Sequence, residues 1–237
     1  MDQNWHVYNS AKVVADYSKR DRLFPPEERV FAEHASAIST ARVLDLGVGG
    51  GRTTRYLLPR ARSYRGIDYA PAMIEACRRN FPECAPEVFA VGDARDLSAE
   101  PAGGYDFVLF AYNGIDLVSH DDRLEIFAEV RRVLSPGGLF FFSTHSLHGF
   151  PSADADVQSR NLDVDMKVIQ RHGWGQLIDH KPDSVTYYIY PSAQREQLET
   201  SGFELVEALD MAARPFDFRD PSADWMVHFL CRHKAHG

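Results

Sequence analysis

The residues of this chain best suited to hold a ligand form a glycine-rich turn behind a short apolar run. Val43 to Leu46 has the pattern of a buried β-strand, and glycines follow at positions 47, 49, 50 and 51. Glycine lets a ligand approach the backbone closely, and a helix expected to start near Gly51 offers free backbone N–H groups at its N-terminus. The turn therefore predicts a site for a nucleotide or a carboxylate.

Two aspartates follow the next two predicted strands. Asp68 ends the strand predicted over residues 63–67, and Asp93 follows the strand predicted over residues 86–91. The carboxyl ends of neighbouring parallel strands meet at one edge of a sheet, where open α/β sheets bind their ligands. Solvated strand-end carboxylates are the alternative, and their joint placement after consecutive strands favours a ligand site.

Candidates for proton transfer lie after the fourth and fifth predicted strands. They are Asp116, His120, His145 and His148, and any of them could take a proton from a hydroxyl or an amine. His145 directly follows the fifth strand, predicted over Leu139 to Ser143, and ranks first, with a structural role as its alternative. Asp116 could instead bind a substrate amine. His145 and His148 lack a third ligand at a persuasive spacing, so no metal site is predicted.

The elements that position these residues alternate between short apolar strands and amphipathic helices. This alternation is typical of an α/β fold with a doubly wound, mostly parallel sheet. A helix capped by Asp121 or Asp122 precedes the fifth strand, and a closing helix followed by two strands suits an antiparallel edge strand. The remaining elements are predicted over residues 107–111 (strand), 185–190 (strand), 192–201 (helix), 203–209 (strand) and 225–231 (strand).

Two segments lie outside this alternation within the single predicted domain of residues 1–237. Residues 1–40 carry a helix after Pro25 and Pro26 and are predicted to form an N-terminal flap. Residues 146–190 begin with a polar stretch without a clear period and are predicted to form a lid over the substrate site. Their aromatic residues predict either a wall for an organic substrate or the buried face of a hairpin: Trp174, Tyr187, Tyr188 and Tyr190.

Composition limits the partners of this 237-residue chain. A formal net charge of −8 disfavours binding to a phosphate backbone, so no nucleic-acid partner is expected. No run of about eighteen apolar residues predicts a membrane helix. The N-terminus lacks the pattern of a signal peptide and the three cysteines lack a disulfide pattern, which together predict a cytoplasmic protein. The oligomeric state, monomer or homodimer, stays open.

The detail of the glycine turn separates two classes of cofactor. A dinucleotide fingerprint needs a sixth-position glycine, and Arg52 occupies that place. The pattern Asp45-x-Gly47-x-Gly49-x-Gly51 instead resembles the first motif of class I methyltransferases that use S-adenosylmethionine (SAM). The segments Arg132 to Gly138 and Gly202 to Glu204 resemble two further segments of that family. The resemblance covers about residues 40–145 and implies a seven-stranded sheet.

The resemblance also implies a role for each part of the site. The glycine turn lies against the methionine part of SAM, Asp68 accepts hydrogen bonds from the ribose hydroxyls, and Asp93 binds the adenine. The segment after the fourth strand, Ala111 to Asp116, flanks the reacting methyl group. The implied cofactor-binding residues are Tyr17, Gly47, Gly49, Gly51, Asp68, Tyr69, Met73, Asp93, Ala94, Arg95, Ala111, Tyr112 and Asn113.

The sequence therefore predicts a SAM-dependent methyltransferase that moves a methyl group to an oxygen or nitrogen atom of a small molecule. A nucleic-acid or protein methyltransferase is the alternative substrate class; the net charge and the absence of an Asn-Pro-Pro-aromatic motif argue against it. An NAD-dependent oxidoreductase and a SAM-binding module without catalysis are the alternatives of a different class.

Overall fold

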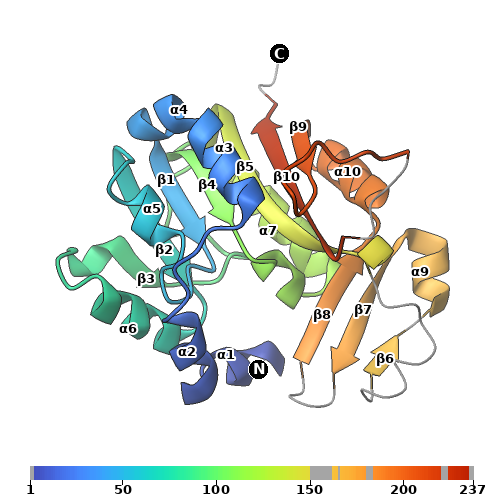
Figure 1. Ribbon diagram of the computed structural model, residues 1–237, viewed down its shortest axis with the longest axis horizontal. Helices are drawn as coiled ribbons and strands as arrows, with labels where there is room; N and C mark the ends of the chain where they lie inside the picture. Colours follow the sequence, from blue (N-terminus) through green and yellow to red (C-terminus); the bar gives the residue numbers. More distant parts are fainter. Residues whose placement is uncertain (1–2, 150–161, 165, 180–183, 220–223, 235–237) are drawn as a thin grey trace.

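Five parallel strands form one side of the central sheet in the order β3-β2-β1-β4-β5, with their carboxyl ends at the lower edge of Figure 1. The computed structural model describes residues 3–149, 162–164, 166–179, 184–219 and 224–234. The strands are β1 (Arg42–Leu46), β2 (Ser63–Asp68), β3 (Phe89–Val91), β4 (Tyr105–Phe110) and β5 (Leu134–Ser146). Most of their residues are buried, which explains their nearly continuous apolar runs.

Two later strands complete a seven-stranded main sheet. They are β9 (Phe203–Leu209) and β10 (Met226–His233), and β10 runs antiparallel to both β5 and β9. The antiparallel strand therefore lies between β5 and the outermost strand β9. The predicted α/β class and the mostly parallel seven-stranded sheet are confirmed.

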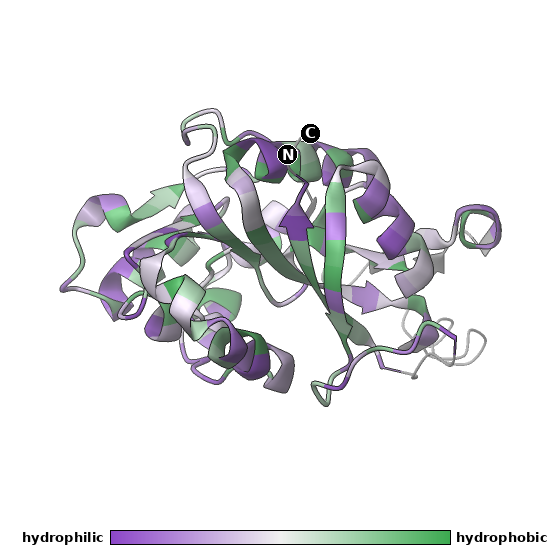
Figure 2. Cartoon of the chain, turned by 90° about the horizontal axis from the view of Figure 1, so that it is seen from above, coloured by the Kyte–Doolittle hydropathy of each residue, from purple (hydrophilic) through white to green (hydrophobic). Residues whose placement is uncertain are grey.

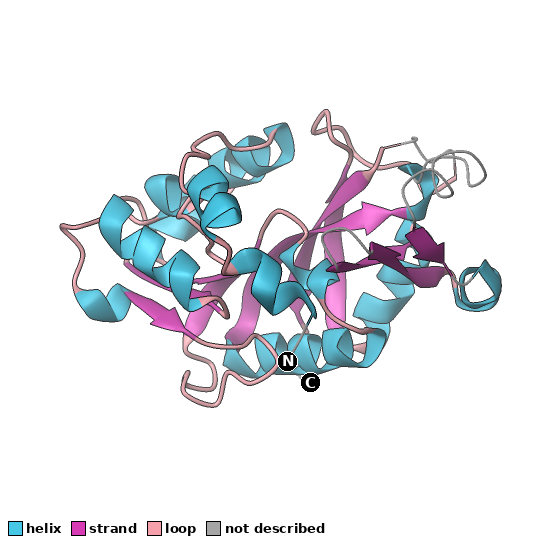
Figure 3. Ribbon diagram, turned by 90° about the horizontal axis from the view of Figure 1, so that it is seen from below, coloured by secondary structure: helices cyan, strands magenta, loops and turns pink. Residues whose placement is uncertain are grey.

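Helices cover both faces of the sheet (Figure 3). Along β1 and β5 successive side chains point to opposite faces: Leu44 and Phe140 join one apolar cluster, and Val43 and Phe141 join the other. The first cluster packs against α7 (His120–Val133) and α10 (Pro191–Thr200). The second packs against α3 (Pro25–Glu33), α4 (Ala35–Thr40), α5 (Thr54–Leu57) and α6 (Pro71–Asn80). Figure 2 shows the resulting hydrophobic strands at the centre and the mixed character of the helices around them.

Two local predictions are corrected by backbone geometry. The helix expected near Gly51 begins at Thr54, because Gly51 has φ of +89°, which a right-handed helix excludes. Helix α7 is capped by Ser119 rather than by Asp121 or Asp122. The Ser119 hydroxyl accepts from the Asp122 N–H at 3.1 Å, and the Asp122 carboxylate accepts from the Ser119 N–H at 3.2 Å, so Asp122 completes a capping box.

Strand β5 is longer than predicted, because it has partners beyond the end of β4. The last pair between β4 and β5 is Phe110 with Phe142, whereas β10 pairs with β5 as far as His145. On the other edge Tyr188 pairs with His145 and Ile189 with Ser146. Tyr188 and Ile189 belong to one strand, which therefore pairs with β5 along the edge beyond the end of β4.

That strand belongs to the predicted lid, which forms a small antiparallel extension of the sheet. The described elements are β6 (Leu162–Val164), α9 (Met166–His172), β7 (Trp174–Asp179) and β8 (Ser184–Ile189). Strand β7 pairs antiparallel with both β6 and β8. Residues 150–161, 165 and 180–183 of the predicted lid lie outside the described residues.

The N-terminal segment lies across the carboxyl ends of the parallel strands (Figure 1). Its helices are α1 (Gln3–Tyr8) and α2 (Ala11–Tyr17). The buried amide of Asn4 donates to the carbonyls of Leu117 and Val185 at 2.8 and 2.9 Å, and it accepts from the Val185 N–H at 3.1 Å. Asn4 thus ties α1 to β8 and to the short 3-10 helix η2 (Gly114–Leu117). Among the described residues, none of the helices has the length and apolar character to cross a bilayer.

Candidate functional site

A pocket opens at the carboxyl ends of β1, β2 and β4, under α1 and α2. It gathers residues far apart in the sequence, from Tyr8 in α1 to Ile126 in α7. Of the implied cofactor-binding residues, all but Gly51 and Asn113 are among its described lining residues. The lining residues predicted from the sequence are Tyr17, Gly47, Gly49, Asp68, Tyr69, Met73, Asp93, Ala94, Arg95, Ala111 and Tyr112.

Two glycines of the turn line the pocket, and a third makes room for a neighbouring side chain. Gly47 and Gly49 line the pocket with φ of +62° and +56°. Gly51 lies elsewhere: a Cβ atom there would come within 2.3 Å of the Phe81 ring. The missing side chain of Gly51 makes room for Phe81, and its contact with the cofactor stays a prediction.

Asp68 joins the glycine turn to the start of α6. One carboxylate oxygen accepts from the Gly49 N–H at 2.8 Å, and the other accepts from the Ala70 N–H at 2.9 Å. Burial raises the pKa of Asp68 to about 6, although the two backbone N–H groups oppose that shift. Each oxygen keeps a second lone pair with which it can accept from a ligand.

Asp93 is the more exposed of the two predicted acids, and Arg95 holds it. The Arg95 guanidinium donates to the Asp93 carboxylate at 2.6 to 3.1 Å, and the Arg95 backbone N–H donates to it at 2.9 Å. Arg95 also reaches Asp122 at 3.3 Å, at the start of α7. The loop after β3 is thereby fixed at the pocket wall.

Tyrosine rings close the side of the pocket formed by the N-terminal segment. The ring centroids of Tyr8 and Tyr17 are 5.7 Å apart, those of Tyr8 and Tyr69 are 6.2 Å apart, and those of Tyr17 and Tyr112 are 5.9 Å apart. Burial raises the pKa values of Tyr8 and Tyr17, so both hydroxyls stay neutral at physiological pH. The wall is therefore aromatic and uncharged.

Two consecutive residues after β4 have a strained backbone. Tyr112 and Asn113 have φ of +54° and +57°, a region that non-glycine residues occupy at a cost of about 1–3 kcal/mol each. The Asn113 N–H donates to the Ser143 hydroxyl at 2.9 Å, and Phe24 stacks on the Tyr112 ring at 5.4 Å. Asn113 is buried and is not among the described lining residues of the pocket, so its contact with the cofactor stays a prediction. Such strain clusters at functional sites.

Comparison with known proteins gives this pocket a chemical context. A family model described as a methyltransferase domain matches residues 43–138, the stretch that contains the glycine turn, both acids and the first residues of β5. A ubiquinone biosynthesis O-methyltransferase of Xanthomonas campestris is 28% identical over 182 residues, which cover 76% of this chain and 70% of that protein.

Solved structures agree on the fold. An S-adenosylmethionine-dependent methyltransferase from Clostridium acetobutylicum superposes with a TM-score of 0.68 at 14% identity, covering 97% of each chain. The CcbJ methyltransferase from Streptomyces caelestis gives a TM-score of 0.64 at 20% identity, covering 99% of this chain and 97% of that one. Residues 43–138 therefore form a methyltransferase domain, and the chain has the fold of SAM-dependent methyltransferases.

The residues that line the pocket fit S-adenosylmethionine. The pocket offers apolar side chains for a flat adenine, including Leu117, Val118 and Ile126, which sequence reasoning missed. An adjoining hollow is lined by the glycine turn together with Arg20 and Arg52. Backbone N–H groups and the Arg20 guanidinium suit the carboxylate of an amino acid, whereas the Arg52 guanidinium is already paired with Glu27. The sequence could have identified Arg20 as a lining residue from its position three residues after Tyr17, which was a predicted cofactor contact.

Asp116 and His145 form a hydrogen-bonded pair beyond the pocket wall. The Nδ1 atom of His145 lies 2.8 Å from Asp116 Oδ2, which also accepts from the His145 backbone N–H at 2.6 Å. The other oxygen of Asp116 accepts from Arg123 at 2.5 Å and from the Thr144 hydroxyl at 2.7 Å. Because a carboxylate only accepts, Nδ1 carries the proton and the imidazole lone pair lies on Nε2.

This network corrects one predicted role of Asp116. Its side chain is fully buried and both of its oxygens are occupied, so a substrate amine cannot reach it. Asp116 instead fixes the orientation and tautomer of His145. The other two histidines differ: His120 bonds to the Tyr187 hydroxyl at 2.8 Å, and His148 lies against the ring of Tyr190. In the described part of the chain, no three His, Cys, Asp or Glu side chains gather as metal ligands do.

Proposed function

We propose that this methyltransferase transfers the methyl group of SAM to a hydroxyl oxygen of a small molecule and that His145 accepts the hydroxyl proton. The observation that carries the proposal is the contact of His145 Nδ1 with the buried Asp116 carboxylate. Relatives named O-methyltransferases support the choice of an oxygen acceptor. The net charge of −8 supports a small molecule over a nucleic acid.

The cofactor residues have distinct tasks in this proposal. Asp68 accepts from the ribose hydroxyls, and Asp93 with the loop at Ala94 and Arg95 holds the adenine against Leu117 and its apolar neighbours. Gly47 and Gly49 admit the amino-acid part, and Arg20 faces its carboxylate. Tyr17, Tyr69, Met73, Ala111 and Tyr112 pack around the remainder of the cofactor.

The chemistry of the transfer needs one base from the protein. Bound SAM supplies a methyl group whose C–S bond breaks as the acceptor oxygen takes the carbon, with the bonding electron pair left on sulfur as S-adenosylhomocysteine. His145 receives the hydroxyl proton on Nε2, and the resulting imidazolium is stabilised by Asp116. Water then takes the proton from His145 and restores the base.

Two segments of the chain enclose the site in this proposal. The flap, residues 1–40, supplies Tyr8 and Tyr17 to the pocket, and Asn4 anchors it to η2 and β8. The lid, residues 146–190, supplies β8 beside His145. Enclosure keeps water away from the transfer and strengthens the electrostatic interactions within it. The cytoplasmic location and the absence of a nucleic-acid partner stay predictions from the sequence.

The experiment measures S-adenosylhomocysteine release with a panel of hydroxylated small molecules, with transfer RNA and DNA as further acceptors. We expect turnover with small hydroxyl compounds. The variant His145→Gln should lower kcat by roughly 10²- to 10⁴-fold, the usual contribution of a positioned base, and leave S-adenosylhomocysteine affinity unchanged.

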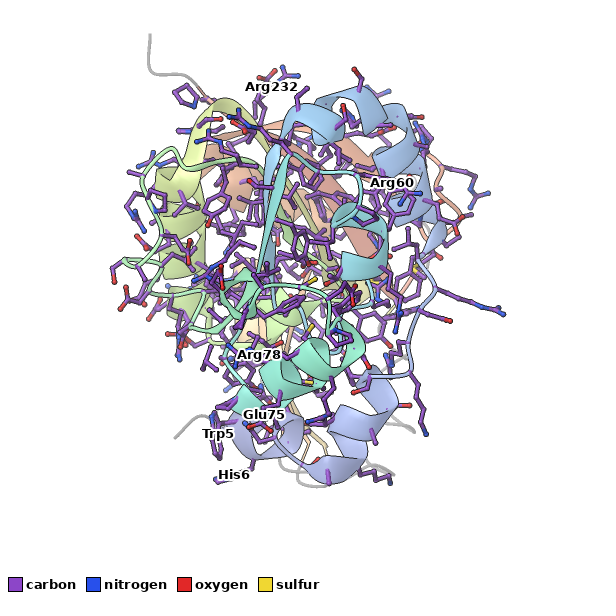
Figure 4. All side chains as sticks on the ribbon, turned by 90° about the vertical axis from the view of Figure 1, so that its left-hand side faces the viewer. Trp5, His6, Arg60, Glu75, Arg78 and Arg232 are labelled. Atoms are coloured by element: carbon purple, nitrogen blue, oxygen red, sulfur yellow. The ribbon has the colours of Figure 1, made fainter. Side chains whose placement is uncertain are left out.

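The matched control is His6→Gln, because His6 is an exposed histidine that projects outward from α1 in Figure 4. It should behave as the wild type. Turnover confined to RNA or DNA would refute the substrate class. Equal kcat values for His145→Gln and the wild type would refute the base and make His145 a part of the scaffold.

A further inference from the structure

The surroundings of His145 contain two aromatic side chains from separate strands. The ring centroid of His145 is 4.9 Å from that of Tyr188 on β8 and 5.7 Å from that of Trp225, which directly precedes β10. Both rings are tilted against the imidazole, by 40° and 42°. We call His145, Tyr188 and Trp225 the aromatic cluster. The inference drawn from it rests on the proposed function, since it concerns the acceptor.

Not every aromatic residue of the lid belongs to this cluster. Tyr187 is fully buried on the opposite face of β8, where the Arg123 guanidinium lies 4.4 Å from its ring centroid. Trp174 stacks on Tyr187 at 5.5 Å and on His120 at 4.1 Å. These two rings therefore attach the hairpin to α7 and form its buried face. Tyr188 lies on the other face of the hairpin, where a wall for an organic substrate is still possible.

Trp225 combines exposure with a fixed position. It is 43% exposed, one of the few large apolar residues at the surface of the described chain. Its backbone carbonyl accepts from the Ser146 N–H at 2.9 Å. Gly149 packs directly against it, because a Cβ atom there would lie 2.3 Å from Trp225 Cα. A large aromatic side chain that is held in place but left exposed is typical of a binding surface.

The proton chemistry at His145 narrows the class of acceptor. A phenolic hydroxyl has a pKa of about 10, and an alkyl alcohol is a much weaker acid. A base therefore takes the proton of a phenol more easily than that of an alkyl alcohol. A phenol also has a flat face that can stack on tyrosine and tryptophan.

We propose that the acceptor is a phenol whose ring packs against Tyr188 and Trp225 with its hydroxyl directed at Nε2 of His145. The ring gains stacking contacts from the two walls, and the hydroxyl gains a hydrogen bond to the imidazole lone pair. During transfer the O–H bond breaks, its proton goes to Nε2, and the oxygen forms the bond to the methyl carbon. An aliphatic alcohol has no flat face for stacking and gives up its proton less easily.

The test measures binding to the complex with S-adenosylhomocysteine, which cannot donate a methyl group, by titration calorimetry. The probes are phenol, catechol and 2-naphthol, each paired with its saturated counterpart: cyclohexanol, cis-1,2-cyclohexanediol and 2-decalol. We expect at least one aromatic probe to bind at least tenfold more tightly than its saturated partner. Tyr188→Leu and Trp225→Leu should each weaken that probe by roughly tenfold, and Trp225→Phe should restore most of the loss.

The control variant is Tyr56→Leu, in which the replaced tyrosine stacks on Phe31 and lies beneath Arg60, on the side of the molecule seen in Figure 4. It should bind the probes as the wild type does. Equal binding of flat and saturated rings, no binding of any phenol, or unchanged affinity in both leucine variants would overturn the inference. Failure of the protein to bind S-adenosylhomocysteine would instead contradict the proposed function itself.

Discussion

Asp68 is a buried acid whose ionisation is coupled to its surroundings. Its pKa of about 6 reflects burial, opposed by the N–H groups of Ala70 and Gly49. At pH 7.5 the carboxylate is mostly ionised and can accept two ribose hydroxyls. Below pH 6 it takes up a proton, and one of those hydrogen bonds loses its charged acceptor. Cofactor affinity should therefore depend on pH through this residue.

Replacement of Asp68 tests that role directly. We expect Asp68→Ala to weaken S-adenosylhomocysteine binding at pH 7.5 by about 1.5 to 3 kcal/mol, the contribution of charge-assisted hydrogen bonds. We also expect wild-type affinity to fall from pH 7.5 to pH 5 and the variant to lose most of that slope. Calorimetry at both pH values measures the two effects. Glu75→Ala, at the exposed glutamate labelled in Figure 4, is the control, and a variant as pH-dependent as the wild type would contradict the assignment.

At the scale of residues, the sequence predicted which side chains line the pocket better than it predicted the hydrogen-bond partners of the residues around it. The positions of Asp68, Asp93 and Tyr112 followed from strand ends, which local patterns reveal. The partnership of Asp116 with Arg123 and Thr144 did not, because their contacts depend on how η2, α7 and β5 pack together. A buried arginine on α7 gives no periodic signal that separates it from an exposed one.

Among the elements, α1 depends on few contacts to stay over the pocket. Asn4, itself buried, supplies two donors and one acceptor to partly buried backbone groups of Leu117 and Val185. Asn4→Ala leaves those groups without their partners, so we expect the free energy of unfolding to fall by about 1–3 kcal/mol. The dissociation of S-adenosylhomocysteine should become roughly tenfold faster, because Tyr8 loses its support.

Stopped-flow dissociation and urea unfolding measure the two effects of Asn4→Ala. His6→Ala, on the exposed side of the same helix, should change neither quantity. If the dissociation rate stays at the wild-type value while stability falls, α1 contributes to the fold but does not retain the cofactor.

Sequence periodicity predicted the main sheet and left the lid unresolved for a physical reason. Strands β1, β4 and β5 each contain a short apolar run, and the predicted helix over 192–201 is found at Pro191–Thr200. Strand β6 is too short, at three residues, to show a period, and β7 gave no clear signal because its described side chains are only half-buried. The full length of β5 could not be predicted from its own sequence either. It depends on pairing with β8 and β10, which are distant in the sequence.

For the molecule as a whole, His228 is a source of acid sensitivity. It is fully buried on β10 near the rings of Phe24 and Phe141, and burial lowers its pKa to about 4, with Glu27 and Arg52 as the charged groups nearby. In the unfolded chain its pKa is about 6.5. The unfolded state therefore binds a proton in the range between these values and the folded state does not, so stability falls as pH falls from 6.5 to 4.

A neutral replacement isolates this contribution. The wild type should lose on the order of 3 kcal/mol more than His228→Leu when the free energy of unfolding is compared between pH 7.5 and pH 4. Urea unfolding at the two pH values measures the difference. The exposed His6→Leu serves as control and should retain the wild-type slope. Parallel curves for the wild type and His228→Leu would show that His228 is protonated without unfolding.

Among the described residues, β8 joins β5 through two residue pairs, and the rings of Trp174 and Tyr187 attach the same hairpin to α7. Changes in the hairpin sequence can therefore reshape what surrounds His145 while the glycine turn, Asp68 and the strands beneath them keep their places. Changes in this hairpin can therefore alter which acceptor the protein methylates, while the residues that hold the methyl donor stay the same. Exchange of this hairpin between relatives offers a direct route to catalysts with altered selectivity.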